Sequence, residues 1–273
     1  MPRFAAMTFM FRPWWADGRM THEDMLAGFA DAGVEGIEPF HRDFVQDPKL
    51  LERYQKCLAD TGLKVAAVDV MCNLVYANEQ QKQQDRDALR LGLDICKELG
   101  TGIAHVAGHK LRDGVTPEDG RKKIVEGFLA VADEARDYGL TLAIEDFNPS
   151  PELICSARDC LEIMQGTGDV LQFVFDTGNF AAAGERADEN FDLLADRICH
   201  CHFKDFAEDP DAERGYGPCD LGEGMIPNAA VAERLMERGY DGWVALETRG
   251  RNELDPVSAV RKELPVLKSW FGS

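Results

Sequence analysis

The stretch from Thr116-Pro117-Glu118 to Thr141-Leu142-Ala143-Ile144-Glu145 carries the signals of one helix followed by one strand. Thr116 before Pro117 is typical of a helix start, and Gly139 is typical of the position just after a helix. Between them, apolar residues recur every three or four positions, at Ile124, Phe128, Val131, Ala132 and Ala135. The run Thr141–Glu145 is short and mostly apolar up to its last residue, which predicts a buried strand.

The same alternation of a short apolar run and a longer amphipathic stretch continues along the chain. Eight such runs are present, at Phe4–Met10, Val34–Glu38, Lys64–Met71, Gly102–Ala107, Thr141–Glu145, Leu171–Asp176, Cys199–Lys204 and Gly242–Glu247. Eight strand–helix units without a linker predict a single domain, residues 1–273, of the α/β class, folded as one (β/α)₈ TIM barrel. An open doubly wound sheet is the alternative, but no G-x-G-x-x-G motif follows any run.

The chain is acidic, with 30 Lys and Arg against 49 Asp and Glu in 273 residues and a formal net charge of −19. This charge repels phosphate backbones and anionic lipids, so we expect neither a nucleic-acid nor a membrane partner. No run reaches the roughly 18 apolar residues of a membrane span, and Met1-Pro2-Arg3-Phe4 lacks the layout of a signal peptide. A cytoplasmic protein is therefore expected.

The eight cysteines show no C-x-x-C pair and are interpreted as reduced thiols that fill apolar space. The densest group is Cys199-His200-Cys201-His202, whose residue types are those of zinc sites. Adjacent residues of a strand point to opposite faces, so these four side chains cannot reach one ion.

The last four predicted strands each run apolar and then reach a side chain that can bind a metal. These side chains are Glu145, Asp176, His202 and Glu247. In a barrel the C-terminal ends of the strands meet on one face, where barrel active sites lie. We therefore expect three carboxylates and one imidazole around a single opening.

Carboxylates at the ends of buried strands are costly to desolvate unless they are paired or bind a cation. A divalent ion neutralises three such charges, and the oxygen-rich set favours Mn²⁺, Mg²⁺ or Co²⁺, with Zn²⁺ as a further candidate. Alternatives exist for single members: Asp176 before Thr177-Gly178-Asn179 also fits an Asx-turn, and His202 also fits a core histidine. Their occurrence on four consecutive strands favours the metal site.

These residues lie in motifs that resemble the xylose-isomerase-like barrel family of sugar isomerases and epimerases. That family also includes inosose isomerases, inosose dehydratases and the endonuclease IV branch. The motifs are Gly33-Val34-Glu35-Gly36-Ile37-Glu38, Ala143-Ile144-Glu145-Asp146, Phe175-Asp176-Thr177-Gly178-Asn179, His202-Phe203-Lys204-Asp205, Leu221-Gly222-Glu223-Gly224-Met225-Ile226, and Gly239-Tyr240-Asp241-Gly242-Trp243 leading into Leu246-Glu247. The resemblance covers essentially the whole chain and is most specific from Glu145 onward.

The resemblance implies one divalent metal held by Glu145, Asp176, His202 and Glu247, with Glu145 and Glu247 also serving as the acid/base pair. Two positions depart from the pattern of the ketose 3-epimerase branch. Asn179 stands where that branch has a histidine, and Glu208 where it has an arginine; Arg214 in the same loop is a candidate replacement. The multi-histidine pattern of endonuclease IV is incomplete, in agreement with the acidic charge.

Moving a proton at a carbon next to a carbonyl requires stabilisation of an enediolate, which a divalent ion supplies as a Lewis acid. Epimerisation needs bases on two faces of the substrate, and carboxylates from two strands can provide them. We therefore predict a metal-dependent isomerase or epimerase of a keto-sugar, inosose or related polyol, with Mn²⁺ the favoured ion. A metal-dependent lyase on a sugar-like substrate is the alternative, and a non-catalytic sugar-binding subunit is a third reading.

Further residues near the predicted strand ends are candidates for substrate binding. They are His109, Trp14, Lys204, Asn179 and Arg249. A tryptophan face can stack on a sugar ring, and Lys204 follows His202 by two positions, which places both on one strand face. Glu38 is interpreted as structural and His105 as packed. The family resemblance implies a small sugar or cyclitol as substrate and a homo-oligomer.

Overall fold

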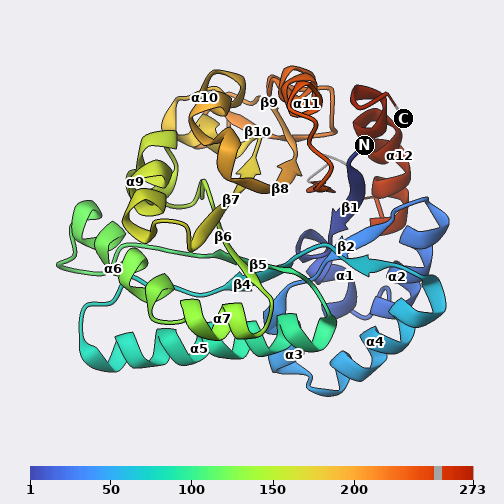
Figure 1. The fold of residues 1–273 in the computed structure, drawn as a ribbon. Coiled ribbons are helices and arrows are strands. Elements are labelled where there is room, and N and C mark those ends of the chain that lie inside the picture. Colours follow the sequence, from blue (N-terminus) through green and yellow to red (C-terminus); the bar gives the residue numbers. More distant parts are fainter. Residues whose placement is uncertain (249–253, 273) are drawn as a thin grey trace.

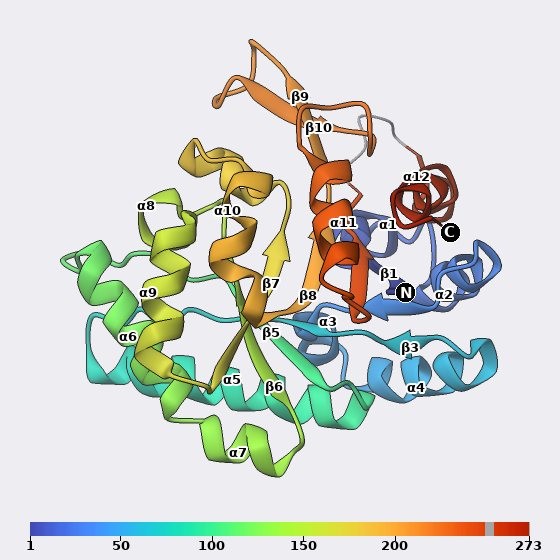
Figure 2. The same cartoon turned by 45° about the horizontal axis from the view of Figure 1, so that its top comes forward.

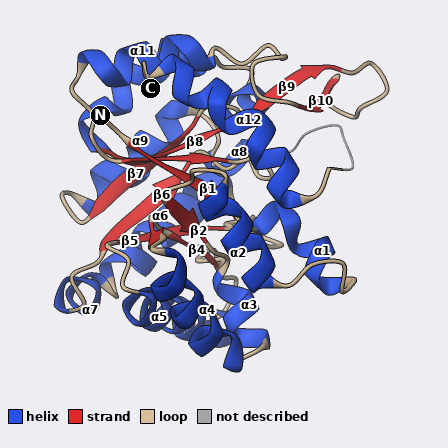
Figure 3. Cartoon of the chain, turned by 90° about the vertical axis from the view of Figure 1, so that its right-hand side faces the viewer, coloured by secondary structure: helices blue, strands red, loops and turns tan. Residues whose placement is uncertain are grey.

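Nine parallel strands form a nearly closed barrel, and helices surround it (Figures 1 and 3). The computed structural model of the protein describes residues 1–248 and 254–272. The barrel strands are β1 (Arg3–Met7), β2 (Gly36–Glu38), β3 (Lys64–Val65), β4 (Val68–Met71), β5 (Ile103–Ala107), β6 (Thr141–Glu145), β7 (Leu171–Asp176), β8 (Ile198–Phe203) and β11 (Trp243–Leu246). This arrangement confirms the predicted TIM barrel.

The strand order around the barrel is β3-β2-β1-β11-β8-β7-β6-β5-β4. The predicted third strand, Lys64–Met71, is divided: its first part, β3, pairs with β2, and its second part, β4, pairs with β5. A bridge between Phe40 and Asp69 joins the chain after β2 to β4. One bent stretch therefore brings the two edges of the sheet together.

The helices follow the start and stop signals of the sequence. They are α1 (Arg12–Ala16), α2 (His22–Asp31), α3 (His41–Gln46), α4 (Lys49–Thr61), α5 (Glu79–Leu99), α6 (Pro117–Leu129), α7 (Ala132–Asp137), α8 (Pro151–Ile154), α9 (Ala157–Thr167), α10 (Ala187–Leu194), α11 (Asn228–Glu237) and α12 (Pro256–Trp270). Thr116 caps α6 by accepting a hydrogen bond from the Asp119 N–H at 3.2 Å. Gly62 ends α4 at φ 77°, a conformation that costs glycine little.

Three local features differ from the sequence-based expectation. β1 ends at Met7 instead of Met10, because a turn of 3₁₀ helix, Phe9–Phe11, and α1 follow at once. The helix predicted through Val131 is broken there: the backbone of Val131, at φ −120° and ψ 5°, separates α6 from α7. An antiparallel hairpin, β9 (Asp205–Glu208) and β10 (Tyr216–Cys219), follows β8 and stands away from the barrel (Figure 2).

The last helix closes the outside of the barrel beside the first strand. The rings of Phe4 in β1 and Phe271 after α12 lie 5.7 Å apart in an edge-on arrangement, and the Lys268 ammonium donates to the Gly33 carbonyl at 2.9 Å. The two ends of the chain consequently lie close together in Figure 1. Among the described helices, none has the length and apolar composition that a membrane crossing needs.

Strand β8 shows the alternation that argued against a zinc site in Cys199-His200-Cys201-His202. His200 and His202 both contact Glu38 inside the barrel, whereas Cys201 belongs to the large apolar cluster between the strands and the helices. All eight cysteines are free thiols, as predicted.

Candidate metal centre and reaction cavity

The four predicted metal ligands meet at the C-terminal end of the barrel. Glu145 and Asp176 are the last residues of β6 and β7, His202 lies in β8 beside Asp176, and Glu247 directly follows β11. None of the four is more than 6% exposed. The parallel register of neighbouring strands thus brings together side chains that are up to a hundred positions apart in sequence.

The imidazole of His202 stands at the centre of this group. Its Nδ1 atom lies 3.7 Å from Glu145 Oε2, 3.7 Å from Asp176 Oδ2 and 3.9 Å from Glu247 Oε2. On the other side of the ring, Nε2 lies 2.9 Å from Glu38 Oε2. A proton on Nε2 satisfies Glu38, and Nδ1 faces the three carboxylates, where binding of a cation would require Nδ1 to be unprotonated.

This donor set fits a divalent cation. Buried Nδ1 of His202 has no hydrogen-bond partner in the described part of the chain, and its carboxylate neighbours lie beyond hydrogen-bond distance from it. The ligand atoms of Glu145, Asp176 and His202 lie within 4.8 Å of one another, as the ligands of one ion do. Carboxylate oxygens with a single imidazole suit manganese, magnesium and related ions.

Lys204 reaches the same group of carboxylates from the end of β8. Its ammonium lies 2.7 Å from Asp176 Oδ2 and 2.8 Å from Glu247 Oε2, and its side chain is only 2% exposed. Two of the three buried negative charges therefore have a cationic neighbour of the protein's own. The predicted position on the same strand face as His202 is the reason for this contact.

Asn179 and the turn before it hold two of the carboxylates in place. The Asn179 side-chain N–H donates to Glu145 Oε2 at 3.3 Å. Asp176 Oδ1 accepts the backbone N–H groups of Gly178 and Asn179 at 2.8 and 2.9 Å. The Asx-turn and the metal-ligand interpretations of Asp176 are thus compatible, because each uses a different oxygen.

Two of the other predicted substrate-binding residues, His109 and Trp14, do not join this group. His109 is 1% exposed, accepts the Leu74 backbone N–H on Nδ1 at 3.3 Å, and is not among the residues that line the cavity above the site. Trp14 lies in α1, and the Arg19 guanidinium lies over its indole ring, 3.9 Å from the ring centre. Trp14 does not line that cavity either. Arg249 lies outside the described residues.

Glu38, which the sequence predicted to be structural, lies at the centre of a second group of buried polar residues. Three histidines surround its carboxylate: His105 Nδ1 at 2.8 Å, His200 Nε2 at 2.7 Å and His202 Nε2 at 2.9 Å. The carboxylate is fully buried. The sequence signal was present, since His200 and His202 are two positions apart and face the same interior as the end of β2.

The charges of this cluster shift the pKa values of its members. Burial alone would raise the pKa of Glu38 and lower that of His202, but their contact lowers the first and raises the second well beyond their usual ranges. Burial would also raise the pKa of Glu145, yet His105 and His202 lower it to about 2. Glu145 therefore stays ionised at neutral pH, as a ligand or a base must.

A cavity of about 950 Å³ opens above the carboxylates. Its floor includes His105, Glu145, Asn179, Lys204 and Glu247. Asp69 also lines it, and burial raises the pKa of this carboxyl to about 7. The cavity is large enough for a sugar or cyclitol, and its lining combines these polar groups with apolar side chains such as Phe40 and Phe147.

The comparisons with known proteins agree with this geometry. The model of the xylose isomerase-like TIM barrel family matches residues 26–270, and the chain belongs to this family. An inosose dehydratase of Lacticaseibacillus casei is 24% identical over 88% of this chain and 85% of its own length. A fructoselysine 3-epimerase of Escherichia coli O157:H7 is 23% identical over 64% of this chain and 62% of its own length.

Solved structures with sugar epimerase activities share the fold. The 3-keto-D-glucoside 4-epimerase of E. coli superposes with a TM-score of 0.78 at 16% identity, over 98% of this chain and all of its own. The D-psicose 3-epimerase of Clostridium cellulolyticum H10 superposes with a TM-score of 0.80 at 14% identity, over 98% and 99% of the two chains. These two structures show that the chain shares their barrel fold over nearly its whole length.

Proposed function

We propose that the protein is a divalent-metal-dependent isomerase or epimerase of a keto-sugar, inosose or related polyol. The observation that carries the proposal is the convergence of three buried carboxylates on the unpartnered Nδ1 atom of His202, at 3.7 to 3.9 Å. Proton transfer next to a carbonyl requires a base and compensation of developing negative charge, and an ionised carboxylate together with a cation held by this group would provide both.

Glu145, Asp176, His202 and Glu247 would hold the cation, with Mn²⁺ the proposed ion. When bound, the cation supplies Lewis-acid stabilisation for the charge that develops on substrate oxygens. The Lys204 ammonium lies 2.7 and 2.8 Å from Asp176 and Glu247 and also lines the reaction cavity. From this position it can donate a hydrogen bond to a substrate oxygen. Its burial makes such a hydrogen bond stronger than one at the surface.

Glu145 and Glu247 are proposed as the acid/base pair. They project from β6 and from the end of β11, which lie on different sides of β8 in the barrel order. Asn179 and His105 orient Glu145, through contacts of 3.3 and 3.4 Å to its two oxygens. The low pKa of Glu145 keeps it ready to accept a proton. Two bases on separate strands can take a proton from one face of a substrate and return one to the other.

A dehydratase is the second candidate function. The inosose dehydratase similarity covers 88% of the chain, and Asn179 replaces the histidine that the ketose 3-epimerase pattern has at this position. Loss of water from the same deprotonated substrate needs a proton donor for the leaving oxygen, and the Lys204 ammonium at the cavity floor provides one.

The test is hydrogen exchange in D₂O by the metal-loaded protein, with a panel of keto-sugars and inososes followed by NMR. Incorporation of deuterium next to the carbonyl without loss of a leaving group supports the isomerase, and a dehydrated product supports the lyase. Glu145→Gln and Glu247→Gln should each lower the rate by about 10² to 10⁴, whereas exposed Glu152→Gln should not. Full activity of both site variants would overturn the acid/base pair.

Three further expectations belong to this proposal. The partner is a small sugar or cyclitol and not a nucleic acid, in keeping with the net charge of −19. The chain acts in the cytoplasm, and it forms a homo-oligomer. Absence of any hydrogen exchange, with metal present, would instead support a non-catalytic sugar-binding protein.

A further inference from the structure

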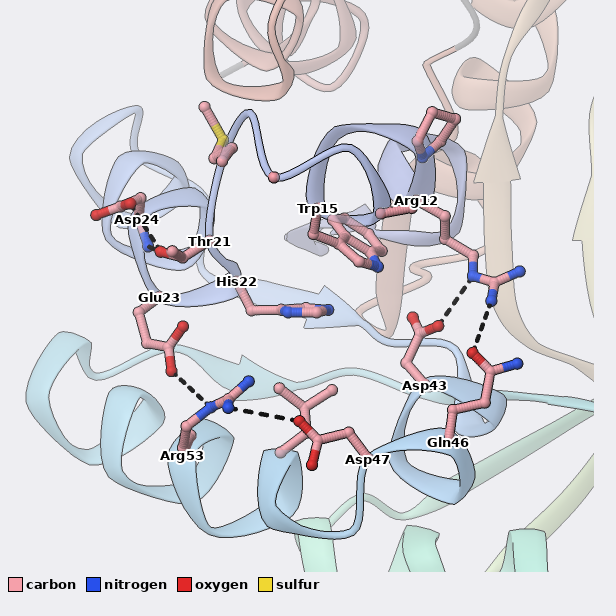
Figure 4. A pocket seen from close by; sticks show the side chains of 15 residues that line it. Arg12, Trp15, Thr21, His22, Glu23, Asp24, Asp43, Gln46, Asp47 and Arg53 are labelled. Atoms are coloured by element: carbon pink, nitrogen blue, oxygen red, sulfur yellow. Dashed lines mark hydrogen bonds and ion pairs between the residues drawn. The ribbon is translucent and has the colours of Figure 1, made fainter.

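A second large cavity lies outside the barrel mouth, between α1, the start of α2, α3 and α4 (Figure 4). Its volume is about 1020 Å³, similar to that of the reaction cavity. The predicted metal ligands and acid/base residues do not line it, and neither does any other residue assigned to the proposed reaction. We call it the Trp15 cavity, after the aromatic residue that forms one of its walls.

Trp15 and His22 form an aromatic wall. Their ring centres lie 4.4 Å apart, with the planes 37° from parallel, and Figure 4 shows the His22 ring extending beneath Trp15 toward the middle of the cavity. His22 is 8% exposed, and its Nε2 atom has no hydrogen-bond partner among the described residues. Burial lowers the pKa of His22 to about 4, so at neutral pH it offers an uncharged polar atom.

Two clusters of planar polar groups also line the cavity, one beside Trp15 and one below His22 (Figure 4). Arg12 Nε contacts Asp43 Oδ1 at 2.9 Å, and a terminal nitrogen of Arg12 contacts Gln46 at 3.4 Å. Arg53 contacts Glu23 at 2.9 Å and Asp47 at 3.4 Å. Each cluster places donors and acceptors side by side, which matches the alternating donors and acceptors of neighbouring sugar hydroxyls.

The Trp15 cavity adjoins the reaction cavity. Arg12 and Gln46 line both. On the reaction side, the Arg12 guanidinium lies 4.8 Å from the ring centre of Phe40, which lines that cavity. Arg12 and Gln46 thus form a shared wall of two side chains between the two spaces.

The lining excludes other ligand classes. Four carboxylates against two guanidinium groups give the cavity a negative balance that disfavours phosphates and nucleotides. A metal ion is disfavoured because Arg12 and Arg53 contact three of those carboxylates. An apolar ligand would leave the buried Nε2 atom of His22 without a hydrogen-bond partner. An aromatic wall flanked by planar polar side chains suits a neutral ring that carries hydroxyl groups.

We propose that the Trp15 cavity is a subsite for a second sugar unit, so that the substrate is a glycoside or oligosaccharide whose keto-sugar unit occupies the reaction cavity. The inference rests on the proposed function, because it assigns the reacting unit to the carboxylate site. Trp15 stacks on the second ring, and Arg12 and Gln46 contact the linkage between the units.

The test is ligand binding by saturation-transfer NMR, with D-fructose and the disaccharide lactulose as matched probes. Lactulose carries the same ketose with a galactosyl unit attached. It should bind the wild-type protein about tenfold more tightly than D-fructose, and its galactosyl protons should receive saturation. Trp15→Ala should remove the advantage. Ala16→Phe fills the cavity from an exposed position of the same helix and should act in the same way. Trp14→Ala removes the neighbouring indole, which lines neither cavity, and should retain the advantage.

The outcomes separate the two proposals. Galactosyl protons without saturation, or an unchanged preference for lactulose in both Trp15→Ala and Ala16→Phe, would overturn the subsite. Loss of the preference in those variants supports it, whatever the hydrogen-exchange panel shows. Absence of hydrogen exchange with every sugar in the panel would overturn the proposed function alone.

Discussion

The six histidines of the chain are all buried, but they occupy two different environments. An inner group surrounds the carboxylate of Glu38 in the barrel and consists of His105, His200 and His202. An outer group lies beyond the barrel interior, without an ion pair in the described residues, and consists of His22, His41 and His109. Both groups have lost contact with water, so burial does not distinguish them.

The difference between the groups lies in the buried carboxylates beside the inner histidines, above all Glu38 and Glu145. Burial lowers the pKa of His22 and His41 to about 4, and that of His109 to about 3. Burial also opposes charge on His105, but Glu145 and Glu38 raise its pKa to about 10. His200 touches the same Glu38 and still has a lowered pKa. One carboxylate therefore does not compensate the burial of every imidazole around it.

The largest effect is expected from removing the charge that separates the groups. Glu38→Gln should lower the free energy of unfolding by about 3–5 kcal/mol, because it leaves buried charged partners without compensation. It should also weaken Mn²⁺ binding about 10- to 100-fold, because His202 loses the group that orients it. Urea unfolding and calorimetric titration measure the two effects. The control is Glu52→Gln, on the exposed side of α4. Wild-type Mn²⁺ affinity in Glu38→Gln would contradict the positioning role.

A second variant removes the positive charge on the other side of His202. Lys204→Met should destabilise the metal-free protein by about 3 kcal/mol, because Asp176 and Glu247 lose their shared ammonium. Saturating Mn²⁺ should shrink this deficit, since the cation stabilises the same carboxylates in the folded state only. Thermal and urea unfolding with and without Mn²⁺ test this, with exposed Lys56→Met as control. A deficit unaffected by Mn²⁺ would show that the carboxylates do not bind it.

The outer group should make the protein sensitive to acid. The pKa of His41 is about 4 in the folded protein and about 6.5 when unfolded. The unfolded state therefore binds more protons between these values, and stability falls as the pH falls through this window. At pH 5 the loss from His41 is about 2 kcal/mol relative to neutral pH.

The variant His41→Asn isolates this contribution, because asparagine does not titrate and can still accept the Met71 N–H. His41→Asn should be less stable than the wild type at pH 7. The difference in free energy of unfolding between the two proteins should be smaller by about 2 kcal/mol at pH 5. Urea unfolding at pH 8, 7 and 5 measures the free energy of unfolding of both proteins. The difference between the two proteins should be nearly the same at pH 8 and pH 7. A gap that stays constant down to pH 5 would mean that His41 is not held neutral.

The smallest effect concerns how the outer histidines are held. His22 is the first residue of α2, and Thr21 caps this helix by accepting the Asp24 N–H at 3.0 Å. Thr21→Ala should lower the free energy of unfolding by about 1 kcal/mol, with no change in Mn²⁺ affinity. The matched variant Thr21→Ser keeps the cap and should behave like the wild type. A loss of Mn²⁺ affinity in Thr21→Ala would show that the two regions are coupled.

The repeated pattern of runs and caps allowed the barrel to be predicted, and the ends of the last four strands allowed the carboxylate group to be found. Local order accounts for this success, because a strand end is defined within a few residues of the acid itself. The division of Lys64–Met71 into β3 and β4 was not predictable, since it depends on two different neighbours across the closed sheet. The burial of His109 and the distance of Trp14 from the cavity likewise depend on packing between distant segments.

The sequence by itself determined the eight strand–helix units, the reduced thiols and the four strand-end residues that are proposed as metal ligands. Only the tertiary structure decided that Glu38 holds three histidines, that the Lys204 ammonium lies between Asp176 and Glu247, and that a second cavity adjoins the first. The physical reason is the range of the interactions. Periodicity and caps depend on residues that are a few positions apart in the chain. Buried charges pair with groups that the fold brings close to them: Glu38 and His202 are in contact although they are 164 positions apart in sequence.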